Sequence, residues 1–364
     1  MSRCIDLFEG AIHSEATLKQ YRYNLDKFLK FVKVRNYDEL LALEDQVLQM
    51  KLEDYLFYLR KTVSPNSIPT TFAPLELFFS MNDRNTLNFK KIRKMFPQTI
   101  KKSGNGYYST EDVKNMLKNC SGKRSRAIIL FLNSTGCRIG VLPDLRMKHI
   151  ADIENCKSVI IYQDSKEEYT TFLTPESSKA LEEYFEERRK DGEIFEKESP
   201  VFRTTYQFGS QKSYPLGHDA LQDVTDRIVK NAGLLREKSG KRYNIQKNHG
   251  FRKRFNTILK QVPDLNSNVA EKLLGHKNGL DGVYFVPTRD ELFTEFKKAI
   301  PDLTIDQSEK LEVKLKEAQV EKNRLEEMER KLESNERLIR MLQETIPADV
   351  YYRLYPEQRP KIQV

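Results

Sequence analysis

The sequence predicts a mainly α-helical, α+β protein with a helical first domain, a second helical domain that holds a small β-hairpin, and a long C-terminal helix. Three observations support this fold class. Apolar residues recur every three or four positions over most of the chain, as they do on one face of a helix. Residues 157–173 instead alternate around a polar turn. Residues 305–346 keep a seven-residue apolar rhythm.

The first hundred residues read as helical. Ser14 can cap a helix whose apolar stripe runs from Leu18 to Val32. The same periodicity predicts helices over 45–62 and about 69–81. A basic stretch then leads to a glycine-containing string that ends at Gly106, and we place a domain boundary there.

The second block starts at Ser109, where two acidic residues suit the first turn of a helix. Residues 124–134 are strongly apolar, which indicates a buried helix. The alternating segment around the charged turn at Lys166 predicts the β-hairpin. Further helices are expected at about 176–190, 217–232, 248–260 and 266–275.

The apolar rhythm of 305–346 is typical of a coiled-coil helix, with a phase break near Met328. Such a helix would be about 60 Å long. It could join protomers, recruit an accessory factor, fold back on the second domain or remain an exposed charged helix. The domains expected from the whole pattern are 1–102 with its basic linker, 107–303, the coiled-coil helix 305–346 and a tail at 347–364.

Composition limits the class of protein. The 364 residues are enough for two or three domains, and 38% hydrophobic against 32% charged residues describes a soluble protein. No apolar run approaches the roughly 20 residues of a membrane span, and the start has no apolar core of a secretory signal. The four cysteines show no paired spacing. We therefore expect a cytoplasmic protein without disulfides or a metal site.

Positive charge is concentrated in two places. The formal net charge is +9, residues 84–102 carry no acid, and residues 236–260 hold nine basic side chains against Glu237 alone. Such runs attract polyanions because they neutralise phosphates and release counterions. The side chains expected to contact double-stranded DNA are Lys90, Lys91, Arg93, Lys94, Lys101, Lys102, Lys247, Lys253 and Arg254.

Two short strings carry the chemistry: Thr135-Gly136-Cys137-Arg138 and His249-Gly250-Phe251-Arg252. Arginine offers a permanently charged, bidentate fork to phosphate oxygens, and residues three apart on a helix share one face. Leu274-Gly275-His276 and Tyr284 follow. A phenol has a reference pKa of about 10, so a nucleophilic tyrosine needs nearby cations or a base to lose its proton.

In this order and spacing, the motifs resemble those of the tyrosine recombinases of the lambda-integrase family, most closely the integrases of archaea and their mobile elements. The resemblance covers most of the chain. It implies a helical core-binding domain that clamps DNA together with a catalytic domain. It also implies strand cleavage through a 3′-phosphotyrosyl bond, without cofactor or metal, by tetramers that pair two DNA sites.

The resemblance also assigns roles to residues. Arg138, His249, Arg252 and His276 would bind the scissile phosphate, with His249 able to take the proton of the nucleophile Tyr284. The family's general acid is a lysine in the hairpin, which is Lys166 here. Lys157, before the hairpin, is the weaker choice.

Some positions depart from the family pattern. The acid that usually stands three residues after the first arginine is replaced by Val141, and Asp144 is differently placed. His276 and Tyr284 are one residue closer than usual, with two glycines between them. The sequence therefore leaves open whether Tyr284 serves its own site or a neighbour's. Tyr351 and Tyr352 lie too far along the chain to compete well as nucleophiles.

Two other functions fit part of the pattern. A type IB topoisomerase shares the arginines, lysine, histidine and tyrosine but relaxes supercoils as a monomer. A DNA-binding or architectural protein with idle catalytic residues would fit Val141 and the shortened spacing. The sequence does not identify the DNA target. It also does not distinguish integration from excision or dimer resolution, or a host from a viral origin.

Overall fold

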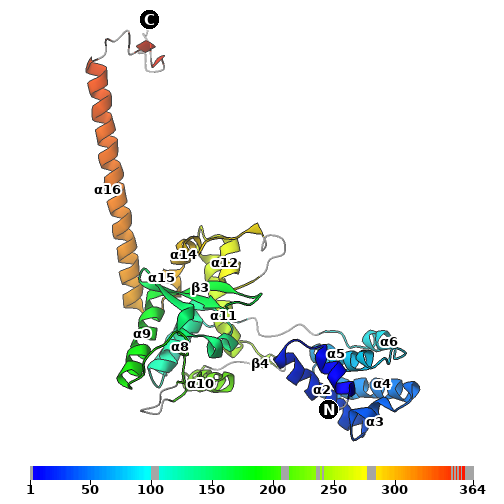
Figure 1. Ribbon diagram of the computed structural model, residues 1–364. Coiled ribbons are helices and arrows are strands. Elements are labelled where there is room, and N and C mark those ends of the chain that lie inside the picture. The colour runs from blue at the N-terminus through cyan, green and yellow to red at the C-terminus, as the bar shows by residue number, and fades with distance from the viewer. Residues whose placement is uncertain are drawn as a thin grey trace. The chain divides into compact units, whose positions relative to one another are not determined.

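The computed structural model describes residues 3–99, 106–205, 213–234, 238–239, 242–276, 284–345, 347, 350, 352–353 and 355–356. The chain divides into two compact units, Met1–Lys102 and Ser103–Val364. The described residues are mainly helical, with a small antiparallel sheet, which confirms the predicted fold class (Figure 1). Among them no helix is both long and apolar enough to cross a bilayer.

The first unit is a helical bundle. Its buried centre is aromatic, with Phe28, Tyr55 and Phe79 among the side chains that pack between α2, α4 and α5. In α6, Phe89 and Ile92 face inward, so the four basic residues of this helix lie outside. The helices are α1 (Arg3–Gly10), α2 (Glu15–Val32), α3 (Tyr37–Leu41), α4 (Asp45–Thr62), α5 (Ile68–Met81) and α6 (Phe89–Lys94), with a 3-10 turn η1 (Pro65–Ser67).

The second unit surrounds a three-stranded antiparallel sheet, ordered β1-β2-β3. Its helices are α7 (Thr110–Lys118), α8 (Lys123–Thr135), α9 (Pro175–Lys190), α10 (His218–Asn231), α11 (Lys247–Gln261), α12 (Ser267–Leu273), α14 (Arg289–Lys297), α15 (Ile300–Leu303) and α16 (Gln307–Thr345), with 3-10 helices η2 (Ile139–Asp144) and η3 (Met147–His149). The strands are β1 (Ile150–Ile153), β2 (Cys156–Ile161), β3 (Tyr169–Leu173), and a short pair β4 (Lys238–Ser239) and β5 (Arg242–Tyr243).

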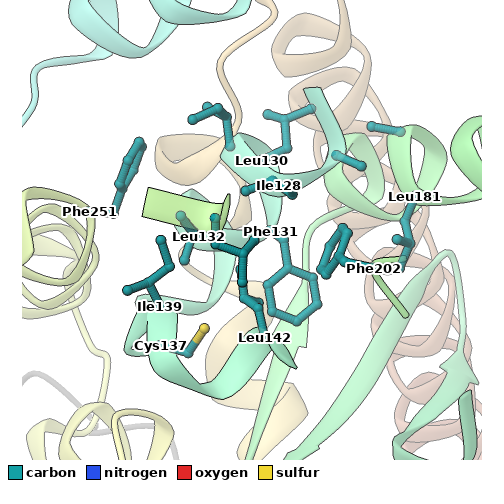
Figure 2. Close-up of a cluster of buried hydrophobic side chains, with 14 of the residues drawn as sticks. Ile128, Leu130, Phe131, Leu132, Cys137, Ile139, Leu142, Leu181, Phe202 and Phe251 are labelled. Atoms are coloured by element: carbon teal, nitrogen blue, oxygen red, sulfur yellow. The ribbon is translucent and has the colours of Figure 1, made fainter. Parts of the chain in front are cut away.

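Helix α8 lies at the centre of this unit. It packs against α9, α11 and β3, and all of its residues from Ala127 to Thr135 are buried. Figure 2 shows Phe131 of α8 beside Phe202, and their rings meet edge to face with centroids 5.6 Å apart. Each such large apolar side chain stabilises the fold by roughly 1.5–3 kcal/mol when fully buried. The C-terminal end of α8, where the motif Thr135–Arg138 begins, is thus rigidly held.

The sheet brings the predicted hairpin to the same end of α8. Ile161 pairs with Tyr169 and Lys157 with Leu173, so the connection 162–168 forms the turn. Ser134 of α8 accepts a hydrogen bond from the backbone N–H of Thr174 at 2.7 Å and donates one to the carbonyl of Phe172. The hairpin and the first motif are therefore joined through one buried hydroxyl.

Helix α16 is continuous for 39 residues, as its periodicity predicts. The buried carboxylate of Glu176 accepts the backbone N–H groups of Ile305 and Asp306 at 2.8 and 3.2 Å, and Lys179 pairs with Glu309. Burial raises the pKa of Glu176. These contacts fix the start of α16, while the apolar side chains farther along it are exposed: Leu315, Leu325, Met328, Leu332 and Ile339.

Candidate active site

The first motif is a tight turn at the end of α8. Gly136 caps the helix in the left-handed region at φ 57°, and a Cβ there would lie 2.7 Å from Phe255. The Thr135 hydroxyl accepts from the N–H of Cys137 and donates to the carbonyl of Phe131. Cys137 turns into the core, and Arg138 leaves it as a half-exposed side chain.

Arg252 of α11, in the second motif (His249–Arg252), joins the first motif (Thr135–Arg138) to the third (Leu274–His276). It is 9% exposed, and its guanidinium donates to the carbonyl of Gly136 at 3.1 Å and to that of Leu274 at 2.7 Å. The same guanidinium meets Nε2 of His276 at 2.8 Å. Three motifs that lie up to 140 residues apart in the sequence therefore converge on one cation.

His276 lies just after α12, where Gly275 adopts φ 67° and turns the chain. The backbone N–H of His276 donates to the carbonyl of Glu271, and Nδ1 of its ring lies 2.5 Å from the carboxylate of the same residue. The ring of Tyr169 fills the space where a Cβ of Gly275 would stand, at 2.4 Å. Only glycine fits between the hairpin and this turn.

His249 is an exposed residue of α11 near both arginines. Partial burial of its ring, and then the positive charges of Arg252, Arg138 and Lys253, lower its pKa. Its imidazole is therefore neutral at pH 7 and can accept a proton. Gly250, next to it, lets α11 approach the ring of Tyr108, which would lie 2.6 Å from a Cβ at that position.

The two candidate lysines of the hairpin differ in their surroundings. Lys166 is exposed in the turn, and its neighbour Glu167 lies 3.8 Å from Arg138, so this turn reaches the first motif. Lys157 lies within the hairpin, on β2, and not before it as expected. It is buried and forms ion pairs with Asp152 at 2.6 Å and Glu182 at 2.7 Å. Burial opposes the charge of Lys157, but the two carboxylates outweigh it and raise its pKa. Lys166 remains the better candidate acid.

Val141 is buried in the core, so its position brings no carboxylate to Arg138. Asp144 is exposed at the end of η2. Among the described residues, Arg138 forms an ion pair with Glu167, from the hairpin turn. A residue of the hairpin, rather than one of the first motif, thus provides the acid nearest to this arginine among the described contacts.

Tyr284 is 82% exposed, while its neighbour Phe285 packs against the cluster formed by α12 and α14. Residues 277–283, which connect it to His276, lie outside the described residues. Within the described part of the chain, no hydrogen bond links the phenol to Arg138, Arg252 or the two histidines. The structure therefore brings Arg252 and His276 together at the turn that leads to Arg138, with His249 close enough to feel both arginines. Lys166 lies in the adjacent hairpin turn, and the phenol of Tyr284 is exposed.

The basic residues expected on DNA have several environments. Lys90 and Lys94 are exposed on α6, where Lys91 pairs with Glu53 and Arg93 with Glu76. Lys247 pairs with Asp226, Lys253 is half-buried, and Lys101 and Lys102 lie outside the described residues.

Arg254 requires a correction. It is 3% exposed, and its guanidinium donates to Asn133, to the carbonyl of Tyr108 and to Thr110. Because every branch of the side chain is used inside the unit, Arg254 stabilises the fold and does not face DNA. Its place on α11 explains the error, since Arg252 and Arg254 point into the domain from a segment that reads as a basic run.

Two residues near the centre were not predicted from the sequence. Glu271 binds His276, and Lys260 of α11 binds Glu271 at 2.5 Å. Glu271 precedes the histidine by five residues, a spacing that places the two together only because the chain turns at Gly275. Among the described residues, no group of three His, Cys, Asp or Glu side chains could hold a metal ion.

Residues 107–280 match the model of the phage integrase family. Tyrosine recombinase XerC of Lactobacillus leichmannii is 24% identical over 273 residues, which cover 71% of this chain and 84% of that protein. The XerC of Anoxybacillus flavithermus is 25% identical over 288 residues, with 77% and 90% coverage.

Solved structures show the same fold. The Tn1549 transposon integrase in complex with transposon right end DNA has a TM-score of 0.52 at 14% identity, and the match covers 82% of this chain and 99% of that one. A lambda integrase dimer bound to a core site has a TM-score of 0.50 at 13% identity, with 78% and 95% coverage. The match over residues 107–280 and the XerC relatives thus support a tyrosine recombinase with a domain similar to that of the phage integrases.

Proposed function

We propose that this site-specific recombinase cuts duplex DNA by attack of Tyr284 on one phosphodiester, which leaves a 3′-phosphotyrosyl bond and a free 5′-hydroxyl. The 5′-hydroxyl of a partner strand then attacks that bond and releases the tyrosine. One observation carries the proposal: the guanidinium of Arg252 contacts both the first and the third motif. The charge of the same guanidinium also lowers the pKa of His249.

Charge explains the roles of the cations. Attack on a phosphodiester concentrates negative charge on the non-bridging oxygens, and preorganised donors stabilise that charge most where water is excluded. Arg252 is held by two carbonyls, whereas Arg138 is half-exposed and its ion pair with Glu167 is 3.8 Å long. We infer that Arg252 forms the fixed part of the phosphate site and that Arg138 closes on the phosphate when DNA binds.

Proton transfer completes the reaction. The lowered pKa of His249 suits it to accept the proton of Tyr284, and we infer that role. We infer that Lys166, in a hairpin turn whose Glu167 lies 3.8 Å from Arg138, protonates the leaving 5′ oxygen. No step of this scheme consumes a cofactor, because the phosphotyrosyl bond conserves the energy of the broken ester.

The relatives favour recombination over topoisomerase activity. The relatives from Lactobacillus leichmannii and Anoxybacillus flavithermus are XerC recombinases. The helical first unit suits a DNA clamp, with the basic residues of α6 on its outer face. The alternative of an idle DNA-binding protein has less support, since the cationic centre is assembled with its hydrogen bonds in place. We infer a cytoplasmic enzyme that acts as a tetramer on paired DNA sites and comes from archaea or their mobile elements.

We further propose that α16 pairs with α16 of a second copy as a coiled coil. The helix from Gln307 to Thr345 contains nine basic and ten acidic residues, so it is nearly neutral in a basic protein. That balance suits a protein partner better than DNA. The exposed apolar stripe recurs at coiled-coil spacing on both sides of Met328, and a second copy supplies a stripe of the same length and phase.

Tyr284→Phe should bind DNA as the wild-type enzyme does and form no covalent adduct, because the ring loses its nucleophilic oxygen. The probe is a nicked duplex, selected from a randomised pool by covalent capture on the wild-type enzyme. Denaturing electrophoresis detects the adduct, and Tyr352→Phe is the matched control that keeps it. An adduct on the Tyr284→Phe protein would remove this residue from the role.

Mixing Tyr284→Phe with Arg138→Gln protein should distinguish the two modes of tyrosine delivery. Adduct recovered from the mixture indicates that a neighbour supplies the phenol.

Lys166→Ala should slow adduct formation by about 10²–10⁴-fold, the usual contribution of a general acid. A duplex with sulfur in place of the bridging 5′ oxygen should restore the rate, because a thiolate leaves without a proton. Lys157→Met, checked for folding by circular dichroism, should show no such rescue. Rescue confined to the Lys157 variant would transfer the role to that residue.

Arg138→Gln should raise the pKa of His249 towards its ordinary value of about 6.5, because a nearby positive charge that disfavours the imidazolium is removed. The titration of the histidine ring protons by NMR at low salt measures this change. Arg138→Lys keeps the charge and should keep the pKa of His249 low. Equal midpoints in the two variants would show that Arg138 does not act on this ring.

Leu325→Lys combined with Leu332→Lys should convert an α16-linked dimer into monomers, because each change places a charge in the apolar stripe. Asn323→Lys with Glu333→Lys adds the same side chains off the stripe and should leave the dimer intact. Light scattering on the full-length protein without DNA gives the mass. A wild-type monomer would exclude pairing through α16.

A further inference from the structure

We propose that Glu271 is a positioning residue of the active site: its carboxylate fixes the tautomer of His276, and His276 in turn holds the Arg252 guanidinium in place for the scissile phosphate. This inference rests on the proposed function, in which Arg252 binds that phosphate. It adds a residue of α12 that belongs to none of the sequence motifs.

Hydrogen-bond chemistry leaves one neutral tautomer. An arginine guanidinium has donors and no acceptor, so Nε2 of His276 must accept from Nη2 of Arg252 at 2.8 Å. The ring proton therefore lies on Nδ1, which donates to Oε2 of Glu271 at 2.5 Å. Glu271, His276 and Arg252 form a chain in which each group fixes the hydrogen-bonding role of the next.

The backbone holds this chain at two points. Glu271 binds His276 both through its carboxylate and through its main-chain carbonyl, which accepts the N–H of His276 at 3.0 Å. The left-handed Gly275 makes this return of the chain possible, and Tyr169 packs against it. The imidazole is thus confined over the last turn of α12, next to Arg252.

The arrangement also explains how the site keeps its positive charge. Among the described residues, Arg252 bonds to two carbonyls, the imidazole of His276 and the hydroxyl of Tyr169, none of which is a carboxylate. Val141 brings no acid to the first motif. A carboxylate directly on Arg252 would compete with a phosphate. With an imidazole between them, Glu271 orients the guanidinium and does not neutralise it by direct contact.

A purely structural role for Glu271 is the plain alternative. Its carboxylate also pairs with Lys260 at 2.5 Å and so links α12 to α11. Burial opposes ionisation of Glu271, but the hydrogen bonds from Lys260 and His276 outweigh it, so the pKa of Glu271 is lowered and the group is charged at neutral pH. Loss of Glu271 removes both contacts, whereas loss of Lys260 removes only the link between helices.

The test compares Glu271→Ala with Lys260→Met in the full-length protein. Long-range proton–nitrogen NMR spectra of histidine-labelled, DNA-free protein report which ring nitrogen carries the proton, and the His276 signals are assigned by their loss in His276→Gln. We expect Nδ1–H in the wild type and in Lys260→Met, and loss of this preference in Glu271→Ala. Adduct formation on the selected nicked duplex should fall about 10–100-fold in Glu271→Ala and by less than about 3-fold in Lys260→Met.

Glu271→Asp, which keeps the charge on a shorter side chain, should recover part of the rate and the Nδ1–H tautomer. Equal losses of rate in Glu271→Ala and Lys260→Met, with Nδ1–H retained in both, would reduce Glu271 to a link between helices. An Nε2–H tautomer in the wild type would overturn the proposal without any variant. A wild-type protein that shows Nδ1–H yet links to no duplex would contradict the proposed reaction but not this geometry.

Discussion

The guanidinium of Arg252 is the constraint on which the active site depends. It is almost fully buried, and it ties the turn after α8 to the end of α12 through backbone carbonyls and one imidazole. A buried cation without a partner would be costly, so these contacts fix the turn geometry as firmly as they fix the arginine. The site is consequently preorganised in the absence of DNA, which is what electrostatic stabilisation of a phosphoryl transition state requires.

Glycines make this arrangement possible at three places. Gly136 lets the first motif turn against Phe255, Gly250 lets α11 approach Tyr108, and Gly275 leaves room for Tyr169. In each case a Cβ would stand closer than 3 Å to an aromatic ring. The motifs therefore encode backbone shape as well as chemistry, which explains why their glycines accompany the arginines and histidines in the sequence.

The sequence predicted local structure well and side-chain partners less well. Periodicity and capping signals located α2, α4, α5, α7 to α12 and α16. They missed α1, α3, α6, α14 and α15, in which few turns are available to show a repeat. The motif residues were found because phosphate chemistry restricts the residue types. Glu271 and the burial of Arg254 were missed, since both depend on how α11 and α12 pack. The path from His276 to Tyr284 lies outside the described residues and stays a prediction.

The contact between Tyr169 and Gly275 links two parts of the active site. Tyr169 begins β3, directly after the turn that carries Lys166, and its ring lies against the glycine that precedes His276. The hairpin that carries Lys166 and the turn that carries His276 therefore share one packing contact. A substitution of Tyr169 would disturb both candidate catalytic side chains at once, although Tyr169 belongs to neither motif.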